Sequence, residues 1–178
     1  MTKSLMKRII AIALLFSAAT SCQKDKEKEF AGNYLVQFVI HPGENSYLVP
    51  SSDTTTLWIN SGDSTQPWQF SPIGKNQYSI SPSGNNNRVL SANGSSISLV
   101  IKPASLSNKE SFYIDKRSNS EVSFRSTGSG QLINVVYAEK NNTIWGYSVS
   151  MLAPDSCIMN YTYVDTQWCI PSFKLLKK

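Results

Sequence analysis

The stretch Gln66-Pro67-Trp68-Gln69-Phe70 has two weaker copies farther along the chain. The second copy, Glu110-Ser111-Phe112-Tyr113-Ile114, lies 44 residues on, and the third, Thr166-Gln167-Trp168-Cys169-Ile170, lies another 56 residues on. Each copy reads polar, any, aromatic, any, apolar, which is the alternation of a short strand with its large side chains on one face. The spacing predicts a threefold repeat, with Trp168 as the aromatic residue of the third copy.

Two further sets of residues keep nearly the same step. One set opens an apolar strand at steps of 44 residues: Tyr34, Tyr78 and Val122. The other set follows a polar turn at steps of 42 residues: Leu48, Leu90 and Leu132. An apolar run follows each of these leucines, at residues 57–59, 99–101 and 144–146. Four strands per copy in three copies predict about twelve strands.

Residues 30–178 are enough for one domain with a real core. Turn residues interrupt them every few positions and no window has a helical period, which favours an all-β domain. One copy has too small an apolar face to be stable alone, so three copies should share a core around a pseudo-threefold axis. We therefore expect a β-trefoil, a closed barrel of antiparallel strands with hairpins capping one end. A β-sandwich is the alternative, but it would not predict the equal steps.

The expected inward residues are aromatic or aliphatic in every copy. In the first copy they are Tyr34, Val36, Phe38, Leu48, Leu57, Ile59, Trp68 and Phe70. In the second copy they are Tyr78, Ile80, Leu90, Leu99, Ile101, Phe112 and Ile114. In the third copy they are Val122, Phe124, Leu132, Ile144, Trp168 and Ile170.

The N-terminal segment has the layout of a secretory signal. Lys3, Lys7 and Arg8 precede an uncharged run at residues 9–19, and small residues lead up to Cys22. The run is too short to span a bilayer. A cysteine directly after the small residues resembles the bacterial lipoprotein signal, which implies that Cys22 is lipidated. An ordinary signal peptide with an incidental cysteine is the alternative.

The domain boundaries follow from this signal. Residues 1–21 are the expected signal peptide, 22–29 the lipidated cysteine with a charged, solvated tether, and 30–178 the trefoil. Its repeats span about residues 30–73, 74–117 and 118–178. The charged tether resembles the export signal of Bacteroidetes surface lipoproteins. That resemblance implies a surface-exposed protein of the bacterial outer membrane, which contacts the membrane through its lipid anchor alone.

Removing the signal also changes the charge balance. The whole chain has a net charge of +5, but loss of three basic residues leaves 14 basic residues against 12 acidic ones. The remainder contains no basic stripe of the kind that follows a phosphate backbone, which argues against a nucleic-acid partner.

The repeat resembles the ricin B-type lectin family over about residues 33–173. The family features are a leucine after a polar turn, an apolar–tryptophan pair and a terminal Gln-any-Trp, which is intact at Gln66 and Trp68. The second copy has Glu110 and Phe112 in those places, and the third has Thr166 before Trp168. The resemblance implies a β-trefoil that binds carbohydrate by stacking an aromatic ring on the sugar.

Carried over to this chain, the resemblance assigns Trp58 as the stacking ring and Gln66 as its polar partner. The family's Asp after the turn leucine is missing in all three copies, where Val49, Ser91 and Ile133 stand. Asp53 is the candidate replacement. A second site is expected at Trp145 and Tyr147 of the third copy.

Both first-copy residues have a structural alternative. Trp58 is expected outward because Leu57 and Ile59 take the inward face, but it could instead pack beneath a loop. Gln66 could hydrogen-bond the hairpin turn as a buried polar side chain, and we favour that role for it.

The third copy is 12 residues longer than the others, with the excess around residues 153–165. With Cys22 lipidated, Cys157 and Cys169 are the remaining thiols of an exported protein. We expect a disulfide that ties the insertion to the last strand, and two buried free cysteines are the alternative.

The sequence gives no support for catalysis. His41 is the sole histidine, and the carboxylates are scattered over turns without a pair marked as acid and base. We therefore expect no enzyme, cofactor or metal, and a monomeric binding module with a glycan or surface protein as its partner. A protein-interaction or protease-inhibitor trefoil without sugar binding is the alternative function.

Overall fold

The computed structural model describes residues 29–39, 45–50, 57–61, 66–140, 143–153, 166–170 and 172–178. At residues 39, 57–61, 137–140, 143–147 and 166–170 it describes the backbone alone. In these ranges the chain forms thirteen strands, close to the predicted twelve, and no helix. The described part of the chain accordingly contains no helix of the length and apolarity needed to cross a membrane.

The strands fall into three repeats. The first contains β1 (Gly32–Val39), β2 (Asn45–Pro50), β3 (Leu57–Ser61) and β4 (Trp68–Gly74). The second contains β5 (Gln77–Pro82), β6 (Arg88–Asn93), β7 (Ser96–Ile101) and β8 (Phe112–Lys116). The third contains β9 (Val122–Ser126), β10 (Leu132–Lys140), β11 (Thr143–Leu152), β12 (Thr166–Ile170) and β13 (Lys174–Lys177).

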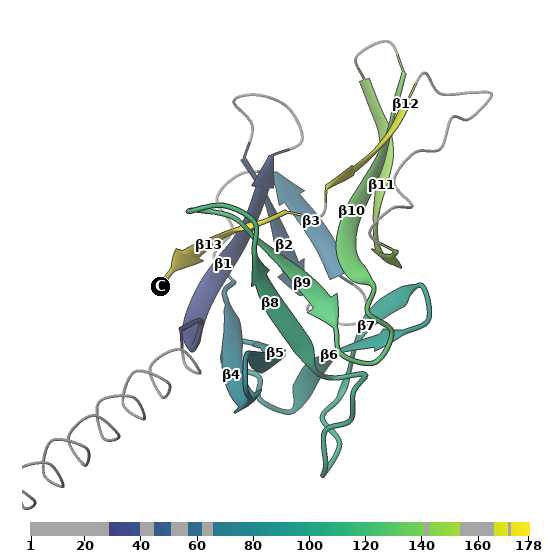
Figure 1. The fold of residues 1–178 in the computed structure, drawn as a ribbon. Coiled ribbons are helices and arrows are strands. Elements are labelled where there is room, and N and C mark those ends of the chain that lie inside the picture. Colours follow the sequence, from purple (N-terminus) through teal and green to yellow (C-terminus); the bar gives the residue numbers. More distant parts are fainter. Residues whose placement is uncertain are drawn as a thin grey trace, which may run out of the picture.

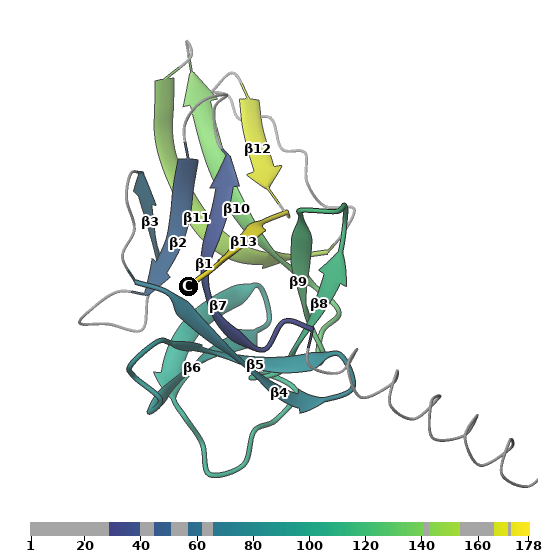
Figure 2. The ribbon, with the colours of Figure 1, turned by 90° about the vertical axis from the view of Figure 1, so that its left-hand side faces the viewer.

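Six strand segments close into an antiparallel barrel (Figures 1 and 2). Strands β1, β4, β5, β8 and β9 pair in that order, and β13 pairs with β1. Phe173, just before β13, bridges to Val122 of β9 through two backbone hydrogen bonds of 2.8 Å. Each repeat adds one hairpin to this barrel. In chain order the hairpins are β2–β3, β6–β7 and β10–β11. The chain is a β-trefoil.

Aromatic rings from all three repeats lie in one buried core, to which the second repeat contributes Tyr78 and Phe112. The ring of Phe70 lies 5.4 Å from Tyr34 and 5.8 Å from Phe124, measured between centroids. Phe173 in turn lies 5.2 Å from Phe124 and 6.0 Å from Phe38. These edge-on and tilted pairs add to the large apolar area that the rings bury. The predicted shared core is therefore confirmed where side chains are described. The side chains of Leu57, Ile59, Ile144 and Ile170 lie outside the described residues.

Trp68 and Phe112 are both buried in this core, as their positions in the repeat predict. The indole N–H of Trp68 donates a 2.7 Å hydrogen bond to the backbone carbonyl of Leu48. The bond satisfies a buried donor and ties β4 to the first hairpin. The side chain of Phe112 has no hydrogen-bond donor. It therefore cannot form, in the second repeat, the bond between barrel strand and hairpin that Trp68 forms in the first.

The third core aromatic is Phe173, and the prediction of Trp168 was wrong. The backbone of Trp168 lies in β12 and pairs with Tyr137 of β10, whereas Phe173 is fully buried and closes the barrel. The alternating pattern at Thr166 fits a strand without specifying its partner. Pro171, which has no backbone N–H, stands in the sequence between the two strands. The insertion of the third repeat therefore includes β12, which extends the β10–β11 hairpin (Figure 1).

One other expected core residue is displaced, and another is buried outside the central cluster. Ile101 shares the alternation of Ile97 and Leu99, but it is the last residue of β7 and is 82% exposed. At Ile101 the strand β7 lies beyond the part of the core that the hairpin covers. In the third repeat Ile133 joins the central core, while its neighbour Leu132 is buried outside that cluster.

Replacing Phe173 with alanine should destabilise the protein more than is usual for a residue so near the C-terminus. We expect Phe173→Ala to lower the free energy of unfolding by about 3–5 kcal/mol, as for large buried aromatics. Leu176→Ala is the control, since Leu176 lies in the same segment but is 38% exposed. Urea unfolding measures both variants, and equal small losses would contradict barrel closure by Phe173.

Candidate functional site

Of the predicted first-repeat site, Trp58 lies in β3 of the β2–β3 hairpin and Gln66 stands just before β4. The backbone of Trp58 pairs with Val49, the position where the family Asp is missing. The side chain of Trp58 and all of Asp53 lie outside the described residues. Trp145 and Tyr147 lie in β11, where the backbone of Tyr147 pairs with Tyr137. Their side chains lie outside the described residues too, so both sugar sites remain predictions.

The predicted cysteine chemistry is also untested. Cys22 and Cys157 lie outside the described residues. Cys169 is described by its backbone alone, which pairs with Val136 of β10. Lipidation and the disulfide therefore remain predictions.

Gln66 is the one predicted sugar-site residue whose side chain is described, and it is exposed. The expectation of a buried structural glutamine was therefore wrong. Gln66 stands two residues before the buried Trp68, so the barrel fixes its backbone while its side chain faces solvent. Its counterpart in the second repeat, Glu110, is only 7% exposed.

Glu110 is held by three hydrogen bonds. The hydroxyl of Ser91 donates to Oε1 at 2.9 Å, and the backbone N–H and hydroxyl of Ser107 donate to Oε2 at 2.9 and 2.6 Å. Burial raises the pKa of the Glu110 carboxyl, but these hydrogen bonds outweigh it, and the pKa lies below its ordinary value. The carboxylate therefore ties the segment after β7 to β6 and has a structural role.

This network occupies the second-repeat counterpart of the predicted sugar site. Ser91 stands where the family has Asp, and Glu110 stands where it has Gln. Their direct hydrogen bond uses the polar groups that a ligand would need. Of the two repeats, the first thus keeps its polar position open to solvent and the second does not.

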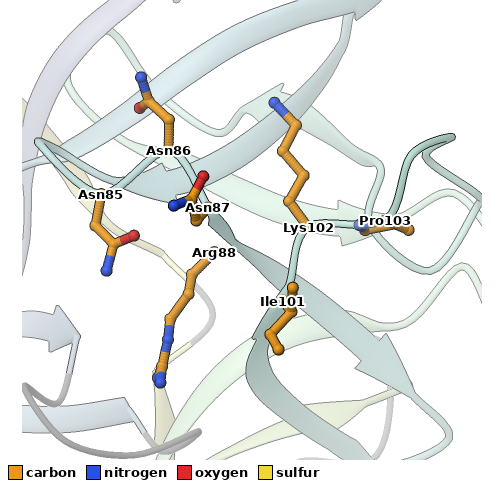
Figure 3. A pocket seen from close by; sticks show the side chains of 7 residues that line it. All are labelled: Asn85, Asn86, Asn87, Arg88, Ile101, Lys102 and Pro103. Atoms are coloured by element: carbon orange, nitrogen blue, oxygen red, sulfur yellow. The ribbon is translucent and has the colours of Figure 1, made fainter.

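A hollow of about 480 Å³ lies at the base of the β6–β7 hairpin. One wall comes from the turn before β6 and the other from the end of β7 (Figure 3). Seven residues line it: Asn85, Asn86, Asn87, Arg88, Ile101, Lys102 and Pro103. The sequence places Asn85 and Asn86 in the polar turn before Leu90 and predicts Ile101 in the core. The clearest signal for the hollow in the sequence is a basic residue beside each of the two segments, Arg88 and Lys102.

Backbone hydrogen bonds frame this hollow. The N–H of Lys102 donates to the carbonyl of Asn87 at 2.7 Å and joins the two walls. The N–H of Asn85 donates to the carbonyl of Pro82 at 3.1 Å, and Arg88 pairs with Ile101 across the hairpin. The walls are therefore fixed by the fold itself.

No family model and no curated protein sequence matches this chain. In structure it is similar to cytolethal distending toxin from Haemophilus ducreyi, with a TM-score of 0.56, 12% identity, and 80% of this chain and 82% of that chain covered. The toxin from Actinobacillus actinomycetemcomitans gives a TM-score of 0.53 at 12% identity, covering 78% and 90% of the two chains. The designed threefold-symmetric protein ThreeFoil gives 0.50 at 14% identity, covering 82% and 99%. At these identities the similarity is one of fold.

Glu110 should make the stability depend on pH in the acidic range. Because its pKa is lowered in the folded state, its contribution is complete above the ordinary value of about 4.3 and is lost as the pH falls through the folded pKa. We expect the stability advantage of wild type over Glu110→Gln to shrink as the pH is lowered from about 5.

Urea midpoints of the two proteins at a series of pH values measure this difference. Glu121→Gln is the control, because it removes a carboxylate outside the Glu110 network. A wild-type advantage that is constant across the acidic range would contradict the structural role of the Glu110 carboxylate.

Proposed function

We propose that this protein is a non-catalytic binding module, held at the bacterial outer membrane by a lipid on Cys22, which binds carbohydrate with Trp58 and Gln66. The exposure of Gln66 carries the proposal. Its second-repeat counterpart is buried and hydrogen-bonded, so of these two repeats the first is the one that offers this position to a ligand.

The register of the β2–β3 hairpin supports Trp58 as the stacking ring. Trp58 pairs with Val49, which is half-buried and stands between the buried residues Leu48 and Pro50. Directly opposed residues of antiparallel strands share a face of the sheet. The pairing of Trp58 with the half-buried Val49 is thus the register expected if the Trp58 ring faces outward.

The roles of two carboxylates favour a protein without catalysis. Asp115 accepts two hydrogen bonds from the guanidinium of Arg125, at 2.7 and 3.0 Å, and Glu110 is used by the serine network. Arg125 also lies over the ring of Tyr113, 4.6 Å from its centroid. These carboxylates stabilise neighbouring strands and are not available as a free acid and base pair.

A protein-binding function is the second candidate, and the third repeat favours it. Strands β10 and β11 have 9 and 10 residues, whereas their counterparts in the other hairpins have 5 or 6. With β12 added, they form a long three-stranded extension that could pair with or pack on a protein.

A glycan array tests the first candidate directly. We expect the mature chain carrying Cys22→Ser, which remains soluble, to bind a subset of neutral glycans. Trp58→Ala should abolish this binding, because it removes the stacking surface, and Gln66→Ala should weaken it roughly tenfold by removing a hydrogen-bonding partner.

The comparison variant for that experiment is Trp145→Ala, at the predicted stacking residue of the third repeat. Loss of binding in Trp145→Ala with full binding in Trp58→Ala would overturn the assignment to the first repeat. A blank array from a folded protein would overturn sugar binding and leave the protein-binding candidate.

The lipid anchor is tested in a bacterial host that processes lipoproteins. We expect the wild-type chain to partition into the detergent phase of a phase-separating detergent and to incorporate labelled fatty acid. Cys22→Ser should do neither, because the acyl chains attach through that sulfur. Wild-type protein that stays in the aqueous phase, without label, would contradict the anchor.

A further inference from the structure

The geometry of the β6–β7 hollow points to a further saccharide site, one for a sugar that carries a carboxylate or sulfate group. This inference rests on the proposed function, since it takes the same module to bind saccharides. It assigns a different place and a different chemical class of ligand from those of the first-repeat site.

The hollow is not the second-repeat copy of the Trp58 site. Leu90 pairs with Leu99 in β6–β7 as Leu48 pairs with Ile59 in β2–β3. On that alignment Ser98 takes the place of Trp58, and Ile101 lies three residues beyond it at the base of the hairpin. The two sites therefore use opposite ends of their hairpins.

Ile101 gives the hollow an apolar surface. Its side chain is 82% exposed and stands outside the hydrophobic core, so it adds nothing to the packing of the fold. Pro103 lies on the same wall. A small apolar patch beside polar groups is what the C–H face of a sugar ring requires.

Asn85, Asn86 and Asn87 give the hollow its hydrogen-bonding groups. All three side chains are exposed, and each amide offers a carbonyl acceptor and an NH₂ donor. Sugar hydroxyls also act both as donors and as acceptors, so neighbouring amides can hold a pair of them. Three adjacent amides suit a ligand rich in hydroxyls.

The charge of the hollow sets the class of sugar. Arg88 and Lys102 are among the seven lining residues, and none of the seven is acidic. Hydrogen bonds from a cationic group to a carboxylate or sulfate are stronger than neutral ones. Arg88 also interacts within the protein, so the exposed Lys102 is the sharper residue to test.

The fixed walls lower the cost of binding. The 2.7 Å bond between Lys102 and Asn87 holds the amide run and the basic residue in one frame before any ligand arrives. A preformed site loses less conformational entropy when the ligand binds.

Calorimetric titration of the mature chain carrying Cys22→Ser tests the inference. The probes are tri-galacturonate, a sulfated disaccharide, a neutral galactose trisaccharide and inorganic sulfate. We expect at least one of the two acidic saccharides to bind, and its affinity to fall as NaCl is raised because the attraction is screened. The neutral sugar and inorganic sulfate should bind at least roughly tenfold more weakly at this site.

Matched variants locate the binding. Lys102→Gln should weaken the acidic saccharide roughly tenfold, while Lys75→Gln, which removes an equal charge from the exposed β4–β5 turn, should not. Ile101→Ser should also weaken it, while Ile73→Ser, at a residue that is 41% exposed in β4, should leave it unchanged.

Trp58→Ala separates the two proposals. Acidic-saccharide binding that survives Trp58→Ala and is lost in Lys102→Gln supports this site, whether or not the neutral-glycan site exists. Acidic binding that is lost in Trp58→Ala but kept in Lys102→Gln would overturn this site and support the first-repeat one. Three other outcomes would also overturn the β6–β7 site. Both acidic probes could fail to bind, the neutral sugar could bind equally well, or inorganic sulfate could bind as tightly as the saccharide.

Discussion

The structure depends on one contact between residues 51 positions apart in the chain, the paired backbone hydrogen bonds of Val122 and Phe173. These bonds, with the pairing of β13 on β1, turn an open row of barrel strands into a ring. Closing the ring removes two sheet edges that would otherwise be exposed. It also places the Phe173 ring beside those of Phe38 and Phe124, so the segment just before the last strand completes the core that all three repeats share.

The features that the three repeats share are used for packing the barrel. A function in this fold must therefore come from the positions at which the repeats differ. Trp68, Phe112 and Phe173 take equivalent buried positions, whereas the residues just before them vary. Gln66 faces solvent, while Glu110 is drawn inward by serine hydrogen bonds. One scaffold thus leaves this position open to solvent in one repeat and uses it for an internal hydrogen-bond network in the next.

The sequence predicted the trefoil because three copies of one strand pattern, at nearly equal steps, can satisfy their apolar faces only by sharing a core. It misplaced Trp168 because a polar, aromatic, apolar alternation specifies a strand and not its partner. It misplaced Ile101 because alternation does not tell where a hairpin leaves the core. The hollow was missed for a related reason, since Asn85–Asn87 have the composition of an ordinary turn and gain their second wall only when β7 folds back.

Amide hydrogen exchange followed by NMR tests barrel closure most directly. A strand at the end of a chain normally frays and exchanges quickly unless it is tied into the fold. Closure predicts that the amides of Phe173 and Val122, which donate to each other's carbonyls, exchange as slowly as that of Ser81, a buried residue of β5 paired with Gln69 of β4. Exchange of the Phe173 amide within minutes, with Ser81 still protected, would show an open barrel and contradict this account.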